Sequence, residues 1–106
     1  MTFDDNVIIG KTIKDPDKLI KKLMTRKHVP GCFLVCVNVA GTGLEIYPTV
    51  LLKESRIKEK PLKVVAVFHK KDEAMEFIRR LCETALSKFG ECDLLKALPY
   101  YDGEVS

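Results

Sequence analysis

Residues 71–89, KDEAMEFIRRLCETALSKF, carry the pattern that decides the fold. Apolar residues recur every three or four positions, which places them on one face of an α-helix; they are Ala74, Phe77, Ile78, Leu81, Cys82, Ala85, Leu86 and Phe89. Gly90 follows directly, and glycine readily takes the left-handed conformation that ends a helix. The pattern predicts a long amphipathic helix over about 71–89, with one apolar stripe to bury against another element.

The residues before this helix have the alternation and the β-branched content of strands. Strands are predicted at 6–14, 32–40 and 62–69, and we expect 32–40 to be the most buried because it is apolar on both sides. Gly-Thr-Gly at 41–43 predicts a hairpin turn into the run LEIYPTVLL. Pro48 has no N–H to donate to a sheet, so this run is an edge strand or breaks there.

A shorter helix is predicted after the first strand. Asp15 is placed as its N-cap, and Pro16 stands at the first helical position, where a missing N–H costs nothing. The apolar residues that follow share one helical face; they are Leu19, Ile20, Leu23 and Met24. Both predicted helices therefore have a single stripe to bury.

These elements give the order β-α-β-β-β-α, with an optional last strand in CDLLKALPYY and a loose tail over 99–106. We expect an α+β fold: a two-layer sandwich whose antiparallel-dominated sheet of four or five strands carries both helices on one face. The first β-α-β unit requires parallel strands, and the later strands join as a meander. The order approaches that of ferredoxin-like folds, as a variant with an additional strand.

Length and composition fit one domain. The chain has 106 residues, and no linker rich in Gly, Pro or Ser divides it. Its longest apolar run, GCFLVCVNVA, is far shorter than a membrane span. Residues 1–20 lack the pattern of an export signal, and four cysteines in such a chain are expected to be reduced thiols. We therefore expect a cytoplasmic protein with no membrane association.

The cysteines do not have the spacing of a metal site. On a strand, Cys32 and Cys36 would be about 13 Å apart, whereas two thiolates on one zinc ion lie roughly 4 Å apart. Cys82 lies on the apolar stripe of the long helix and is expected in the core, and only Cys92 is placed to be exposed. No metal and no cofactor are expected.

The sequence offers little for catalysis, so we lean towards a non-enzymatic protein. A Cys–His pair would require His69 to approach Cys36, which depends on the second and fourth strands being neighbours. No serine or cysteine stands on a glycine-flanked turn between a strand and a helix, as in a nucleophile elbow. A histidine at a strand end is more often a polar cap.

Charge is distributed unevenly around the net +3 of the whole chain. Residues 11–28 hold seven Lys or Arg against two Asp, and residues 53–63 hold five against two Glu. Such basic segments can contact phosphates without reading a base sequence, although lysine-rich helix faces are also common solvated surfaces. The candidate nucleic-acid-binding residues are Lys18, Lys21, Lys22, Arg26, Arg56 and Lys58.

A candidate anion site lies at the start of the long helix. His69, Lys70 and Lys71 stand where the first turn presents unpaired N–H groups. Asp72 and Glu73 belong to the same turn and repel an anion, which favours a purely structural role for these residues.

The main hypothesis is a small non-enzymatic binding or protein-interaction module. It would pair with a second copy of itself, or with another protein, through the sheet edge that Pro48 marks. The alternative is nucleic-acid or anion binding through 11–28 and 53–63.

Overall fold

The computed structural model describes residues 1–25, 31–53 and 61–101. The elements along the chain are β1 Thr2–Ile9, α1 Pro16–Met24, β2 Phe33–Val37, β3 Leu44–Pro48, the 3₁₀ turn η1 Thr49–Lys53, β4 Lys63–Phe68, α3 Lys71–Phe89, α4 Leu94–Ala97 and the 3₁₀ turn η2 Leu98–Tyr100. Among these residues, none of the helices is both long and apolar enough to span a bilayer.

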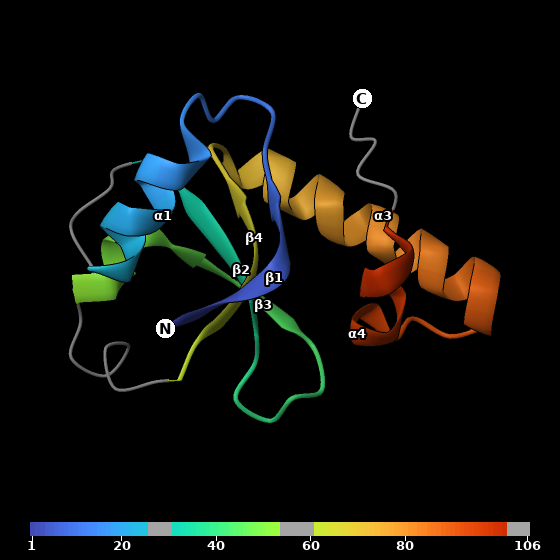
Figure 1. The fold of residues 1–106 in the computed structure, drawn as a ribbon. Coiled ribbons are helices and arrows are strands. Elements are labelled where there is room, and N and C mark those ends of the chain that lie inside the picture. Colours follow the sequence, from blue (N-terminus) through green and yellow to red (C-terminus); the bar gives the residue numbers. More distant parts are fainter. Residues whose placement is uncertain (26–30, 54–60, 102–106) are drawn as a thin grey trace.

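The described strands form an open mixed sheet in the order β1-β4-β2-β3 (Figure 1). β4 pairs with β1 in parallel and with β2 in antiparallel register, and β2 pairs with β3 across the hairpin. Two of the three described pairings are therefore antiparallel. The expected α+β class is confirmed, and the described sheet is mixed and has four of the four or five strands expected.

The order of the strands differs from the expected variant of the ferredoxin-like order. β1 and β2 are neither neighbours nor parallel, because β4 lies between them, and β3 and β4 do not form a meander. Both β4 and β2 are interior strands with a neighbour on each side, and β4 is the more buried of the two, because every one of its residues after Lys63 is buried. β3, which ends at Pro48, lies at the edge, as predicted.

The helices cover both faces of the sheet, so the prediction that both lie on one face is wrong (Figure 1). Leu19 and Leu23 of α1 pack with Leu34 of β2 in one core. Phe77 of α3 packs with Val35 of β2 in the other core. Every residue of β2 is apolar, so both faces of this strand require a cover.

The local signals for helix ends and turns are confirmed. The N–H of Lys18 donates to Oδ1 of Asp15 over 3.1 Å, which caps α1. Gly90 ends α3 with φ 73°, and its N–H donates to the carbonyl of Leu86. β1 covers residues 2–9 instead of 6–14, because the chain turns after Gly10.

The C-terminal segment forms α4 and η2 in place of the optional last strand. A disulfide joins Cys82 of α3 to Cys92, with Cα atoms 5.1 Å apart, so the prediction of four reduced thiols is wrong for this pair. The turn at Gly90 brings Cys92 back beside the helix, which the residue pattern alone did not indicate. Cys32 and Cys36 are free and buried. Residues 102–106 of the expected tail lie outside the described part of the chain.

Candidate binding pocket

A hollow lies between α4 and the sheet. A helix of the length of α3 extends about 28 Å, whereas strands of five or six residues extend about 17–20 Å, so α3 projects beyond the sheet. The chain folds back under this projecting end and places α4 beside it (Figure 1). A cavity of about 480 Å³ remains. It is lined by Asp4, Asn6, Ile8, Val37, Lys63, Val65, Leu95, Leu98 and Pro99.

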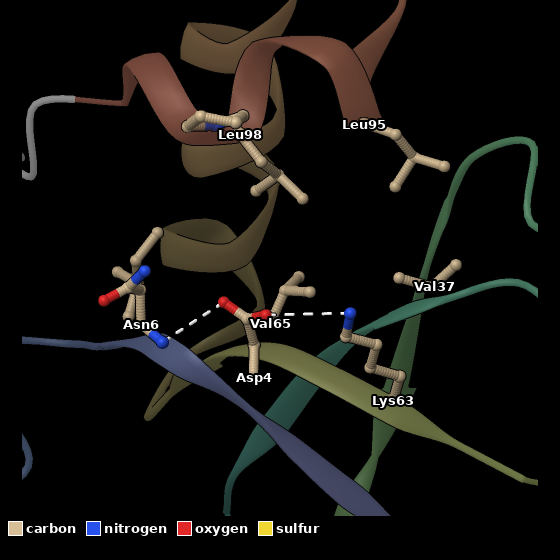
Figure 2. A pocket seen from close by; sticks show the side chains of 9 residues that line it. Asp4, Asn6, Val37, Lys63, Val65, Leu95 and Leu98 are labelled. Atoms are coloured by element: carbon tan, nitrogen blue, oxygen red, sulfur yellow. Dashed lines mark hydrogen bonds and ion pairs between the residues drawn. The ribbon is translucent and has the colours of Figure 1, made fainter.

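The walls of this cavity, which we call the α4 pocket, are apolar on two opposite sides. Val65 of β4 and Val37 of β2 form the floor, and Leu95 and Leu98 face them from the helical segment above (Figure 2). Ile8 adds a further aliphatic group from β1. Small-molecule sites are concave and mostly apolar, with volumes of about 300–1,000 Å³ and a few polar groups that fix orientation. The α4 pocket has these properties.

The polar groups of the pocket come from β1 and β4. Nζ of Lys63 lies 3.7 Å from Oδ1 of Asp4, with the two side chains 55% and 36% exposed (Figure 2). The N–H of Asn6 donates to Oδ2 of Asp4 over 3.2 Å, which orients the carboxylate. An exposed ion pair of this kind contributes at most about 1 kcal/mol to folding. Because both side chains are partly exposed, both charges are accessible to a ligand in the pocket.

A break in the pairing of β1 brings these groups to the pocket. Phe3 pairs with Val64 and Ile8 pairs with Ala66, so residues 4–7 stand opposite the single residue Val65. Irregularities of this type bend an edge strand and redirect its side chains, and they are common beside functional sites. Here the irregular stretch supplies Asp4 and Asn6 to the pocket.

The helical wall of the pocket is fixed to the rest of the fold. The disulfide at Cys92 ties the start of this segment to α3, and the N–H of Lys96 donates to Oδ1 of Asp93 over 3.2 Å at the start of α4. Ala97 is fully buried. At the other end, the ring of Tyr101 packs against Phe77. Leu95 and Leu98 are thus held at a defined distance from the sheet.

At the predicted anion site, the backbone N–H of Lys70 already donates to a carboxylate of the protein. His69, Lys70 and Lys71 are exposed at the start of α3. The N–H of Lys70 donates to Oε1 of Glu73 over 3.1 Å, and the hydroxyl of Thr12 lies 3.5 Å from the same oxygen. The carboxylate of Glu73 makes the contact that an anion would make. Anion binding here stays a prediction.

The predicted nucleic-acid surface is described only in part. Lys18, Lys21 and Lys22 are exposed along α1. Arg26, Arg56 and Lys58 lie outside the described residues. Whether the two basic segments form one surface therefore stays a prediction.

His69 does not approach Cys36. Cys36 lies opposite Val64, whereas His69 follows Phe68, which pairs with Phe33 at the other end of β2. β2 and β4 are neighbours, as a Cys36–His69 pair would require, but the register of the two strands keeps these side chains apart. Cys36 is fully buried, and burial, followed by the nearby charge of Glu45, raises the pKa of its thiol to about 12. A thiol in this state is a poor nucleophile.

Glu45 also accepts a hydrogen bond from the hydroxyl of Tyr47 on the same face of β3. This hydrogen bond, and after it burial, raises the pKa of Tyr47 to about 12. The pair lies next to the core on the α1 side, on the opposite face from the α4 pocket.

The sequence patterns predict none of the residues of the α4 pocket as site residues. Lys63 belongs only to a basic segment, and Asp4 and Asn6 lie at or before the start of the first predicted strand. The i, i+3 spacing of Leu95 and Leu98 was the one local signal for a helical wall. The pocket itself joins β1, β2, β4 and α4, whose relation is set by long-range packing.

Among the described residues, no group of three or more His, Cys, Asp and Glu side chains is arranged to hold a metal ion. Comparison of the chain with protein-family models, with curated proteins and with solved structures finds no match.

Proposed function

We propose that this chain is a non-enzymatic binding module that takes up an apolar group of a small ligand in the α4 pocket. The observation that carries this proposal is the cavity of about 480 Å³ between two aliphatic surfaces, one on the sheet and one on α4. Burial of an apolar group there removes its surface from water, which favours binding by about 25 cal/mol per Å² before the costs of association.

The wall and the floor are built from elements that packing holds in place. Val65 is only 4% exposed, and the segment that carries Leu95 is tied to α3 by the disulfide. A pocket with fixed walls needs little rearrangement on binding, so less of the interaction free energy is lost to ordering.

The test is a titration of methyl-labelled protein with 2-phenylethanol, an uncharged probe with an apolar body. Methyl resonances of Val37, Leu95 and Leu98 should shift together in NMR spectra, with a Kd on the order of 1 mM. Val37→Phe fills the floor of the pocket and should weaken binding at least about tenfold. Val39→Phe adds the same bulk on the hairpin loop, where Val39 is 70% exposed, and should leave the affinity unchanged. Equal affinities of the two variants would refute the site.

A second candidate function, self-association or pairing with a protein partner, rests on β3. This strand is the edge of the sheet beyond β2, and Val50, just after it, is 56% exposed. An edge strand presents unpaired backbone groups to a second chain. Sedimentation velocity at increasing protein concentration tests this proposal. Dimerisation should be weakened by Val50→Lys and not by Val39→Lys, and a strict monomer at high concentration would exclude it.

Nucleic-acid binding is the alternative, supported by the exposed lysines of α1. Fluorescence anisotropy with a labelled oligonucleotide should then give an affinity that falls steeply with salt. Loss of Lys18 and Lys22 together should reduce that salt dependence. An affinity for the oligonucleotide that does not change with salt would argue against this alternative.

A further inference from the structure

The α4 pocket joins one apolar cavity to one positive and one negative side chain at its edge. Lys63 and Asp4 both line the cavity, and both remain accessible to solvent. A ligand with a single charge would attract one of these side chains and repel the other. A ligand with two opposite charges and an apolar body matches all three features.

We propose that the ligand of the α4 pocket is a zwitterionic apolar α-amino acid; this proposal rests on the proposed binding function. The apolar side chain of the ligand occupies the space between Val65 and Leu98. Its ammonium group lies beside the carboxylate of Asp4, and its carboxylate lies beside the ammonium of Lys63.

The spacing of the charges supports this class of ligand. The ammonium and the carboxylate of an α-amino acid are attached to the same carbon atom, so they lie close together. Nζ of Lys63 and Oδ1 of Asp4 are 3.7 Å apart, a comparable distance. The charge pair of the ligand can therefore lie antiparallel to the Lys63–Asp4 pair, with each charge of the ligand next to the opposite charge of the protein.

The Lys63–Asp4 ion pair can also open to admit the ligand without loss of the position of Asp4. Asp4 is oriented by the N–H of Asn6 and not by Lys63 alone, so its carboxylate keeps its position when Lys63 turns towards a guest. Lys63 is the more exposed partner and is free to move its ammonium group. The irregular stretch of β1 places Asp4 here, and Asp5, the next residue, does not line the cavity.

Four compounds with one apolar body separate the contributions: L-phenylalanine, 3-phenylpropionate, phenethylamine and 2-phenylethanol. The first carries both charges, the second only the carboxylate, the third only the ammonium and the fourth neither. Methyl resonances of Leu95 and Leu98 report binding of each compound. L-Phenylalanine should bind about three- to fivefold more tightly than either singly charged compound, and this advantage should shrink at high salt.

Protein variants test each charge separately. Asp4→Asn should remove the preference for L-phenylalanine over 3-phenylpropionate, because the ammonium loses its partner. Lys63→Gln should remove the preference for L-phenylalanine over phenethylamine, because the carboxylate of the ligand loses its partner. Asp5→Asn is the matched control, and the full preference should remain in it. If either pocket variant fails to fold, the series of compounds on the natural protein decides the question.

The outcomes distinguish the two proposals. Equal binding of all four compounds would overturn the amino-acid proposal and leave the binding function intact. Tighter binding of phenethylamine or of 3-phenylpropionate would also overturn it, because these compounds represent a peptide amino terminus or carboxyl terminus. Failure of every compound to shift the methyl resonances of the pocket would overturn both proposals.

Discussion

The ring of Tyr101 meets the ring of Phe77 edge to face, with centroids 4.8 Å apart and planes at 74°. Phe77 is fully buried in the core between α3 and the sheet, so this contact anchors the last described residue to the centre of the domain. The disulfide at Cys92 anchors the same segment at its other end. The wall of the α4 pocket is therefore fixed at two points, and loss of either should loosen it.

Removal of the disulfide should loosen the wall without unfolding the sheet. For the double variant Cys82→Ser, Cys92→Ser we expect a loss of about 2–3 kcal/mol in the free energy of unfolding, because a short loop is no longer closed in the unfolded chain. Hydrogen exchange should accelerate most at the amides of α4. A dithiol reductant should produce the same change in the natural protein and no further change in the double variant. Unaltered exchange in α4 would contradict this role.

Gly90 should be required for its backbone conformation rather than for space. Its φ is 73°, and a Cβ atom placed there would meet no atom within 4 Å. Gly90→Ala should therefore cost about 1–2 kcal/mol, the penalty of a left-handed conformation for a residue with a Cβ atom. Gly90→Asn should cost less, because asparagine tolerates this conformation. The measurement is urea denaturation, and equal losses for the two variants would argue against the backbone explanation.

Stability should fall as the pH rises from about 9 to 12. The pKa values of Cys36 and Tyr47 are about 12 in the folded chain, against about 8.5 and 10 in an unfolded one. Both groups therefore stabilise the fold fully at low pH, and this contribution is lost as they ionise. Tyr47→Phe should give a shallower decline between pH 10 and 12. Urea midpoints of the two proteins at several pH values test this, because the contributions of the lysines cancel in the comparison.

Acid should weaken an ion cluster on the outer face of α3. Glu76 accepts hydrogen bonds from Arg79 and Arg80, and these bonds lower the pKa of its carboxyl to about 2. Its stabilising contribution is present above the ordinary carboxyl pKa and is lost as the pH falls from about 4.5 to 2. Glu76→Gln should flatten this part of the stability profile. Glu91→Gln, which changes an exposed carboxylate outside the cluster, should not.

The local elements could be predicted from the sequence because their signals are local. The stripe from Ala74 to Phe89, in which Leu86 is half-exposed rather than buried, depends on residues a few positions apart. The same holds for the stop at Gly90 and the cap at Asp15. The hairpin is of the same kind, although its loop covers 38–43 rather than the predicted 41–43: the N–H of Asn38 donates to the carbonyl of Gly43 over 2.9 Å.

The arrangement of these elements could not be predicted in the same way. Both faces of β2 are apolar, so the pattern does not say which helix covers which face. The interior position of β4 between β1 and β2 brings together segments that are distant in the chain, so no local pattern indicates it. The α4 pocket depends on Asp4, Lys63 and Leu95 being brought together from the two ends and the middle of the chain. No spacing in the sequence records that proximity.

The most direct test of the central claim is the measurement of intermolecular nuclear Overhauser effects between methyl-labelled protein and bound L-phenylalanine. We expect contacts from the ring protons of the ligand to methyl groups on both walls of the α4 pocket, namely those of Val37, Val65, Leu95 and Leu98. Contacts to Ile46 of β3 and Val50 of η1 instead, with none to Leu95 or Leu98, would contradict the proposed site.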